Sequence, residues 1–489
     1  MSKILIKKEK LKKLIEPHYY KNLVNDEYKL KTINANQLLT FNRFDLCFKL
    51  MFLEKMEYDP AQAMIIYKEH IRSLTLGKFS EPGSLKKNSF EKYIQDFESL
   101  LNDIRENGFK KNKSLIPLSS NGSIANGSHR ASIAIFFNKK VDCVDINVQN
   151  HLYDYIFFYK RKVSTQIMDA AANTFIKYAK NVYIAIIWPS AIGRDKELHA
   201  ILDRVVYLKN VKLNRNGAHN LISQVYFGED WLGSVKDNYK GSDGKLIKCF
   251  KSFDPVKFIA FQSTDEEVVK IKQRIRSLFN LGKHSVHITD NHSESLRVSR
   301  LAFNDNSIHF LNYSKPNKFL STHKKIDNFK LFLKENQINE DSAILDSSIV
   351  LSAYGLREAK DTDFLINKSK DIKFNFDSIN NHEEVLNHYG LKKAHLIYSP
   401  DNYFYFNDVK FTSFSNLYDM KLKRGETKDQ NDLMLMEALI ESNTFKENYA
   451  KLKQFVYYEK IKSRQRALNL LKALGLYIFL KKIYKGLKK

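Results

Sequence analysis

The chain has only three cysteines, Cys47, Cys143 and Cys249, in 489 residues. They lie about a hundred residues apart and form none of the close pairs that structural zinc sites and redox motifs require. The spacing therefore argues against a cysteine metal site and against a disulfide framework. We expect a reducing, cytoplasmic location.

Targeting segments and repeats are also missing from the sequence. The first residues, MSKILIKKEKLKKLIEP, are basic but have no apolar core of signal-peptide length and no small-residue cleavage site. No fixed-period repeat is visible, which argues against solenoid folds. The apolar run in the C-terminal tail is well short of the roughly 20 residues that span a bilayer.

The composition is that of a folded, basic protein. With 43% hydrophobic and 13% aromatic residues, the chain can fill the two to four domain cores that its length predicts. The net charge of +25 is compatible with nucleic-acid phosphates, an anionic membrane surface or small anionic substrates. Lysine-rich composition from an AT-rich genome explains the same charge, so composition alone does not identify the binding partner.

The pattern of apolar residues predicts a multidomain α/β (α+β) protein. Segments such as FEKYIQDFESLLNDIREN place apolar residues three and four apart, whereas VYIAIIWPS, RVVYLKNVKL, SSIVLSAY and DTDFLI resemble strands. The expected parts are a helical lead over 1–110, a compact module over 111–165, a middle α/β domain over 166–325, a third α/β unit over 326–446 and a basic helical tail over 447–489.

An acidic motif lies in the third unit, in DSSIVLSAYGLREAKDTDFL. We expect an apolar strand before Gly355, then a polar turn, then a strand that carries Asp361 and Asp363. Alternation along a strand places both carboxylates on one face, about 7 Å apart. They repel each other unless a cation such as Mg²⁺ bridges them to a nucleoside triphosphate. The alternative is a solvated strand edge.

The motif resembles that of the polymerase-beta-like nucleotidyltransferase superfamily, a strand and Gly-Gly or Gly-Ser followed by Asp-x-Asp between apolar residues. Asp361 and Asp363 match the second half, and Gly355 matches the first. Leu356 stands where a second small residue is usual, and Arg357 supplies positive charge there instead. The resemblance implies a Mg²⁺-dependent enzyme with a nucleoside triphosphate as substrate, in which Asp361 and Asp363 bind the metal.

A later segment extends this resemblance. FTSFSNLYDMKLKRGETKDQNDL is similar to the superfamily's strand, basic helix and Lys-Asp-x-x-Asp-Leu sequence. The resemblance assigns phosphate binding and helix capping to Lys421, Lys423, Arg424, Lys428, Asp429 and Asp432. It also implies a third carboxylate on a neighbouring strand, for which Asp377 is the candidate, while Asp408 reads as a turn residue.

In the module over 111–165, a glycine-rich turn leads into Gly127, Ser128, His129 and Arg130, which open a helix of small residues. A helix N-terminus and an arginine fork both favour phosphate. The segment resembles the ParB/sulfiredoxin fold, in which a similar turn binds nucleotide phosphates. Asn126 stands where an acidic residue would support phosphotransfer, and an ordinary helix start is the alternative.

The middle domain offers one further candidate site. The segment GKHSVHITDNHSESL ends a strand with His287 and Asp290, and strand ends in α/β units commonly face a ligand crevice. Lys283, His287 and Asp290 are the candidates there. His284 and His287 point to opposite faces of a strand, so histidines with structural roles are the alternative.

The tail interleaves apolar residues with lysine and arginine. An amphipathic helix at an anionic inner-membrane surface and a terminal helix packed on the core are both compatible with this pattern. The apolar positions are Leu468, Leu471, Leu474, Ile478 and Leu487.

Together these features predict a cytoplasmic transferase, peripheral to the membrane in one interpretation. Its arrangement is similar to that of bacterial capsule and lipopolysaccharide biosynthesis transferases, which implies nucleotidyl or phosphoryl transfer to a sugar- or alditol-type substrate. The alternatives are a glycosyl or phosphoglycosyl transferase of the same pathway and a nucleic-acid-binding or nucleic-acid-modifying protein. No helix-turn-helix, zinc-finger or RNA-recognition motif supports the last.

Overall fold

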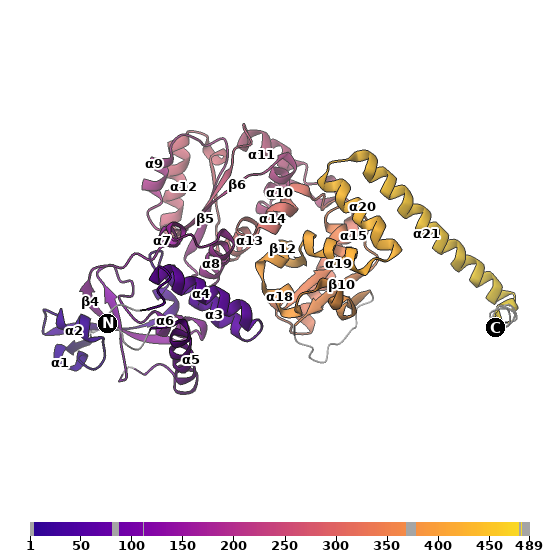
Figure 1. The fold of residues 1–489 in the computed structure, drawn as a ribbon. Helices are drawn as coiled ribbons and strands as arrows, with labels where there is room; N and C mark the ends of the chain where they lie inside the picture. The colour runs from indigo at the N-terminus through magenta and orange to yellow at the C-terminus, as the bar shows by residue number, and fades with distance from the viewer. Residues whose placement is uncertain (1–3, 81–87, 111, 368–377, 479–480, 482–489) are drawn as a thin grey trace.

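Three sheets, each with its own helices, make up the chain, and one long helix projects from its C-terminal side (Figure 1). The computed structural model describes residues 4–80, 88–110, 112–367, 378–478 and 481. The expected mixed α/β, multidomain class is confirmed at this level.

The N-terminal unit is built on a four-stranded sheet of order β1-β2-β4-β3. Strand β2 pairs antiparallel with β4, and β3 pairs parallel with β4. The boundary expected at residue 110 therefore runs through one sheet, and the helical lead folds together with the following module. The elements are β1 (Ile4–Lys7), α1 (Lys8–Leu11), α2 (Pro17–Lys21), β2 (Glu27–Asn34), η1 (Ala35–Leu38), α3 (Asp45–Met56), α4 (Pro60–Thr75), α5 (Phe90–Asn107), β3 (Ile116–Ser119), α6 (Ser128–Phe136), β4 (Lys140–Val148) and α7 (Tyr155–Lys160).

The middle unit holds an antiparallel sheet of order β6-β7-β5-β8. The sequence predicted β5, β6 and β8, and it missed β7, whose VKFIAFQ is buried almost throughout. The elements are α8 (Thr165–Tyr178), β5 (Val182–Ile187), α9 (Asp195–Ile201), β6 (Val205–Val211), α10 (Arg215–Val225), η2 (Asp230–Leu232), η3 (Val235–Asp237), α11 (Gly241–Cys249), β7 (Val256–Gln262), α12 (Asp265–Phe279), η4 (Gly282–His284), β8 (Val286–Ile288), α13 (His292–Ala302) and α14 (Asp305–Tyr313).

The C-terminal unit has a five-stranded sheet of order β11-β10-β9-β13-β12. Strand β9 pairs antiparallel with β10 and parallel with β13. The elements are α15 (Leu320–Glu335), η5 (Glu340–Ser342), β9 (Ala343–Asp346), α16 (Ser348–Ala353), β10 (Thr362–Ile366), β11 (Ile379–Asn381), η6 (Glu383–Val385), α17 (Leu386–Tyr389), α18 (Lys393–Tyr398), η7 (Pro400–Asn402), β12 (Tyr403–Phe406), β13 (Val409–Thr412), α19 (Phe414–Arg424) and α20 (Thr427–Ile440).

One sequence prediction in this unit is wrong. The segment SSIVLSAY, expected to be a strand, forms helix α16 and the turn after it, while the strand lies just before it as β9. The predicted strand DTDFLI is confirmed as β10.

The last helix, α21 (Thr444–Ala473), packs its first turns on α20 and then leaves the body of the molecule (Figure 1). Ala450 is its one buried residue. Among the described residues, no helix combines the length and the apolarity needed to cross a membrane.

Two large cores join these parts. One runs through the N-terminal and middle units, where Phe44, just before α3, stacks on Phe175 of α8 with ring centroids 6.4 Å apart. The other fills the C-terminal unit. The two halves meet where Lys55 donates to the Tyr398 carbonyl at 2.6 Å and where Asp59 lies 2.7 Å from His395 Nδ1.

Candidate active site in the C-terminal unit

The site begins where strand β9 turns into helix α16. Asp346 ends the strand, Ser348 starts the helix, and only Ser347 separates them. Ser347 has φ 61° and ψ −124°, a backbone conformation that residues other than glycine seldom adopt. This sharp turn keeps α16 against the end of the sheet, where the Ser348 hydroxyl donates to Asp361 Oδ1 at 3.2 Å.

Three carboxylates gather at this end of the sheet. Asp363 is the Cα partner of Asp346 in the antiparallel pair of β10 and β9, so the two side chains share a face. Asp361 lies in the bend just before β10, and its charge acts on the Asp363 carboxylate. Asp346 is fully buried, Asp363 is 9% exposed, and Asp361 is partly exposed. The carboxylate pair that the sequence predicted is therefore a group of three.

Asp346 is held by two side chains from beyond β11. The Tyr389 hydroxyl donates to Oδ1, and His382 Nδ1 lies 3.2 Å from Oδ2. Burial lowers the pKa of His382, but its hydrogen bond to Asp346 and the surrounding carboxylates outweigh this, so the pKa is raised overall. Both side-chain oxygens of Asp346 thus have a hydrogen-bond partner, and the carboxyl group orients the imidazole.

Asp363 is in a different situation. No hydrogen-bond donor reaches its carboxylate from any described residue. Burial raises the pKa of Asp363 to about 6; the charge of His382 opposes this rise, and Asp361 and Asp346 add to it. A buried carboxylate without a donor, next to two other carboxylates, gains stability when a cation binds beside it.

The donor set at Asp361 and Asp363 fits a hard cation such as Mg²⁺, because both offer carboxylate oxygens at this end of the sheet. A complete cage of three His, Cys, Asp or Glu side chains is not formed by the described part of the chain. Asp377, the expected third metal ligand, lies outside the described residues. Asp346 is the third carboxylate that the structure brings to the face, although its oxygens already accept from Tyr389 and His382.

A buried ionic cluster borders the carboxylates. Arg357 donates to both oxygens of Asp432, at 2.6 and 2.9 Å, and Lys421 donates to Asp432 at 2.8 Å. Burial raises the pKa of Asp432, but the hydrogen bond and charge of Arg357, followed by the charge and hydrogen bond of Lys421, lower it overall. Burial lowers the pKa of Arg357, but the hydrogen bond and charge of Asp432 raise it overall. The charge of Asp361 contributes to this rise, so the guanidinium lies within electrostatic reach of the site.

The remaining cations of this segment are also engaged. Arg424 donates to both oxygens of Asp429, at 2.8 and 2.6 Å. Lys423 donates to the Tyr389 carbonyl at 3.3 Å, and Lys428 pairs with Glu426 at 3.0 Å on the surface. The cations assigned to phosphate thus line the site's border but contact acidic side chains or backbone in this structure.

Gly355 has a structural role. It follows α16 with φ +75°, and a Cβ atom there would lie 2.6 Å from the Lys315 carbonyl oxygen. It therefore permits a close turn against Lys315 and does not form the strand-to-helix turn at the carboxylates, which is made by Ser347 and Ser348.

The Gly127–Arg130 segment lies in the N-terminal unit, apart from this site (Figure 1). Helix α6 starts at Ser128 as expected, after Gly127 with φ 90°. Arg130 folds over Gly127 and donates to Glu16 at 2.9 Å, and His129 Nε2 lies 2.8 Å from the Tyr67 hydroxyl. Phosphate binding here stays a prediction, and an incoming anion would have to compete with Glu16.

The candidates in the middle unit are paired with close neighbours. His287 Nε2 lies 2.8 Å from Glu294, and Asp290 accepts from Lys272 at 2.8 Å. The Lys283 carbonyl accepts from Lys245 at 2.7 Å. His287 and Asp290 therefore meet at Glu294 of α13, which also accepts from the Asp290 backbone N–H at 2.7 Å, whereas Lys283 contacts Lys245 of α11.

Sequence reasoning missed Asp346, His382 and Tyr389. The signal for Asp346 was an acidic residue that ends the apolar run AIL just before two serines. Comparison with protein-family models, with curated proteins and with solved structures gives no match to this chain.

Proposed function

We propose that the chain is a Mg²⁺-dependent nucleotidyltransferase whose active site is formed by Asp361 and Asp363. The observation that supports this most directly is the donor-free, mostly buried carboxylate of Asp363 beside Asp361, on the face that also carries Asp346. The cation would neutralise phosphate charge and align the attacking group with the leaving group.

The side chains around this pair have distinct parts in the proposal. Ser348 orients Asp361 through its hydroxyl, and His382 and Tyr389 keep Asp346 fixed beside Asp363. Arg357, held rigid by Asp432, supplies positive charge next to Asp361. A nucleoside triphosphate would therefore approach from the Asp361 side, which is the exposed side of the carboxylate group.

We further propose a small phosphorylated sugar- or alditol-type acceptor, as in bacterial capsule or lipopolysaccharide biosynthesis. The support for this substrate class is the similarity in arrangement that the sequence has to such transferases. The same interpretation places the enzyme in the cytoplasm, at the inner face of the membrane.

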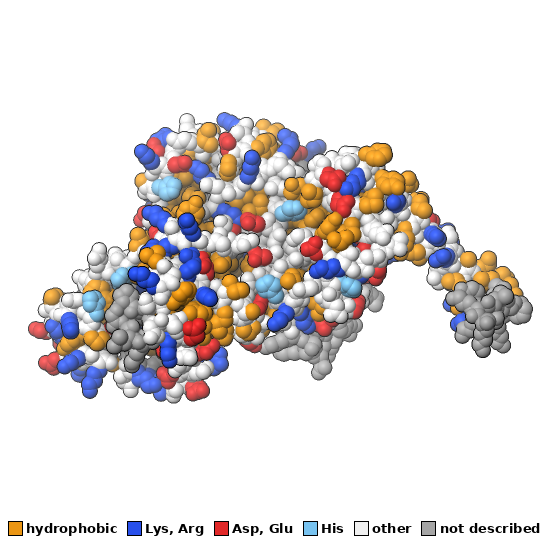
Figure 2. Space-filling view, in the orientation of Figure 1, with side chains coloured by type: hydrophobic (Ala, Val, Ile, Leu, Met, Phe, Trp, Pro, Cys, Tyr) orange, Lys and Arg blue, Asp and Glu red, His pale blue; other side chains and the backbone are white. Residues whose placement is uncertain are grey.

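The projecting helix supports the membrane part of the proposal. Leu470 is 61% and Leu474 is 59% exposed, and hydrophobic side chains lie along the helix in Figure 2. From residue 447 onward the sequence has twelve Lys or Arg residues against two Glu. Apolar and cationic groups on one exposed helix are the combination that binds an anionic membrane surface.

The test of the enzymatic proposal uses Asp361→Asn and Asp363→Asn, which keep the size of the side chain and remove its charge. We expect each to reduce Mg²⁺-dependent pyrophosphate release from nucleoside triphosphates by about 100-fold or more. We expect folding to be retained, and Asp363→Asn to raise the melting temperature, because it removes a desolvated charge.

Asp419→Asn is the matched control, since Asp419 is an exposed acid on α19 of the same unit. It should leave both turnover and melting temperature unchanged. Wild-type turnover in Asp361→Asn or Asp363→Asn would contradict the assignment of the active site to these two residues. Equal turnover with EDTA in place of Mg²⁺ would show that the reaction needs no divalent metal.

A further inference from the structure

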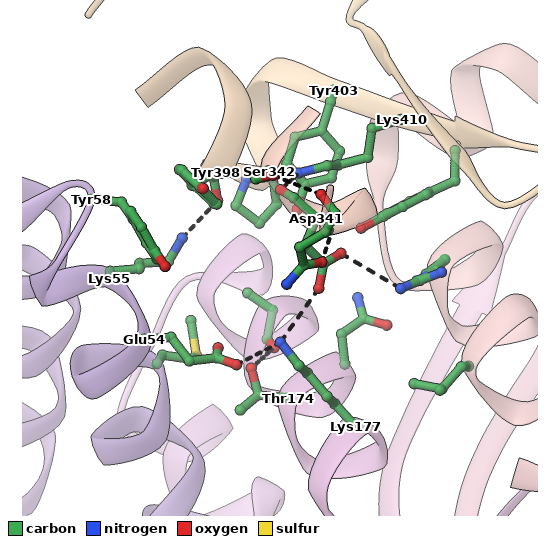
Figure 3. Close-up of a pocket in the computed structure, with 18 of the residues that line it drawn as sticks. Glu54, Lys55, Tyr58, Thr174, Lys177, Asp341, Ser342, Tyr398, Tyr403 and Lys410 are labelled. Atoms are coloured by element: carbon green, nitrogen blue, oxygen red, sulfur yellow. Dashed lines mark hydrogen bonds and ion pairs between the residues drawn. The ribbon is translucent and has the colours of Figure 1, made fainter. Parts of the chain in front are cut away.

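A cavity of about 520 Å³ lies where all three units meet, at the opposite end of strand β9 from the carboxylates (Figure 3). The N-terminal unit contributes the end of α3, and the middle unit contributes α8 and α13. The C-terminal unit contributes the residues before β9 and the β12–β13 hairpin.

Two lysines in the wall of the cavity are buried without an anionic partner. Lys410 of β13 is 4% exposed, and its ammonium donates only to the carbonyls of Asp341 and Ile397. Lys55 of α3 is 9% exposed and donates to the Tyr398 carbonyl at 2.6 Å. Within the described ranges, neither ammonium has a carboxylate at ion-pair distance.

Two acids of the cavity wall, Glu54 and Asp341, are already engaged with other cations. Glu54 accepts from Lys177 at 2.7 Å, and Asp341 lies 3.5 Å from Lys177 and 3.6 Å from Arg300. These two acids therefore pair closely with Lys177 and Arg300, and Asp341 and Glu54 act on Lys410 and Lys55 only at longer range.

This arrangement is costly for the empty protein. Burial lowers the pKa of Lys410 to about 7 in spite of the charge of Asp341, and the charge of Lys55 lowers it further. Burial also lowers the pKa of Lys55 to about 8, although the charges of Glu54 and Asp59 oppose this. A buried cation without a counter-ion is destabilising, and an anion bound between two such cations removes the penalty.

The rest of the wall fits an aromatic ring. Tyr58 and Tyr398 stack at 4.7 Å between ring centroids, and the Tyr403 ring lies 4.9 Å from the Lys410 ammonium. Asn173 also lines the cavity, and its side-chain nitrogen donates to the Phe303 carbonyl at 2.9 Å. The wall thus combines aromatic faces with two buried ammonium groups that have no carboxylate at ion-pair distance among the described residues.

We propose that this cavity binds a small organic anion that carries a planar ring. Its carboxylate or phosphate lies between Lys55 and Lys410, and its ring packs on the tyrosines. Because Asp341 precedes β9 and Asp346 ends it, the bound anion sits about 15 Å along one strand from the proposed active site. It is a second site that joins the three units.

The first experiment uses the wild-type chain with pyridoxal 5′-phosphate, an aromatic aldehyde that carries a phosphate. The unprotonated lysine amine attacks the aldehyde and releases water to form an imine, and borohydride then delivers hydride to the imine carbon to give a stable secondary amine. We expect mass spectrometry to find this label at Lys410 or Lys55 in preference to exposed lysines. Phenyl phosphate should suppress it and phenol should not.

The second experiment measures phenyl phosphate and benzoate binding by calorimetry, with EDTA present so that metal-dependent binding at Asp361 and Asp363 is absent. Lys55→Met and Lys410→Met should each weaken binding at least about tenfold. Lys324→Met, an exposed lysine on α15, should bind as the wild type does. Two variants are used because Lys410 also satisfies two carbonyls.

Two results would overturn the site. One is labelling spread over surface lysines without preference for Lys55 or Lys410. The other is the absence of binding by both ring-bearing anions, or binding that both methionine variants retain. Loss of pyrophosphate release in the Asp361 and Asp363 variants with retained phenyl phosphate binding would separate this site from the proposed active site.

Discussion

At the scale of single residues, the most enclosed part of the proposed active site is Asp346. Its carboxylate is fully buried and depends on the Tyr389 hydroxyl and on His382. Tyr389→Phe removes one donor and leaves the charge buried. We expect the free energy of unfolding, measured by urea denaturation, to fall by about 1.5–3 kcal/mol, as for other hydrogen bonds to charged groups.

Tyr418→Phe is the matched control for this change. Its hydroxyl donates to Glu437 at 2.7 Å, but on the surface of the same unit. Water replaces the lost bond there, so we expect a change below about 1 kcal/mol. Equal losses in the two variants would mean that burial of Asp346 does not determine the cost.

The lowered pKa of buried Lys410 predicts that the stability of the protein depends on pH. The pKa of Lys410 is about 7 in the folded protein and about 10.5 in an unfolded chain. The unfolded state therefore binds more protons between these values, and stability rises with pH across this window. Asp341, Lys55, Arg300 and Lys177 are the charged groups that surround Lys410.

Lys410→Met removes this contribution. We expect the free energy of unfolding of the variant, relative to the wild type, to decrease by up to about 1.4 kcal/mol per pH unit between about pH 7.5 and 9.5. Urea denaturation at several pH values measures the difference, in which the other titrating groups cancel. A difference that does not change with pH would show that the ammonium is not destabilised by burial.

At the scale of elements, Asp432 of α20 connects three segments. It binds Arg357 from the turn after α16, Lys421 from α19, and Gln454 from α21 at 3.1 Å. Asp432→Asn leaves Arg357 without its carboxylate partner and Lys421 with Asp429 alone, so we expect a loss of about 3–5 kcal/mol in the free energy of unfolding. Thermal and urea denaturation, with Asp419→Asn as the surface control, measure it, and a loss equal to the control's would contradict a clamping role.

The elements around the site differ in how far the sequence predicts them. Strand β10 is predictable because its residues are apolar around the two acids. Helix α16 is not, because six residues are too few to show a helical period and Ile349 and Val350 favour strands. The start of α6 after Gly127 is predictable from its turn, whereas Glu16, which binds Arg130 from 114 residues away, follows from no local spacing.

At the scale of the whole molecule, the contacts that define the candidate sites come from distant parts of the chain. Asp346 and Asp363 become neighbours only through the register of β9 and β10. The cavity brings Lys55 within electrostatic reach of Lys410, across 355 residues of sequence. Composition predicted a basic multidomain α/β protein, but local patterns carry no information about which strands pair or which units pack together.

The projecting helix allows the membrane proposal to be tested without disturbing the fold. Residues of α21 beyond Ala450 are exposed or half-buried, so deletion from residue 462 should leave the melting temperature and pyrophosphate release unchanged. We expect the deletion to abolish binding to anionic phosphatidylserine vesicles in a sedimentation assay. Each lysine near an anionic surface contributes about 1 kcal/mol, and the exposed leucines add apolar transfer energy.

The two contributions can be separated in the full-length chain. Raising the salt concentration screens the lysines, so it should weaken vesicle binding without eliminating it. Changing Leu468, Leu470 and Leu474 to Gln should remove the part that resists salt and leave a purely electrostatic remainder.

If the truncated protein aggregates and loses activity, the helix packs on the body in solution and the membrane proposal fails. If the full-length chain does not bind vesicles but binds oligonucleotides with a steep dependence on salt concentration, the positive charge binds nucleic acid and not a membrane.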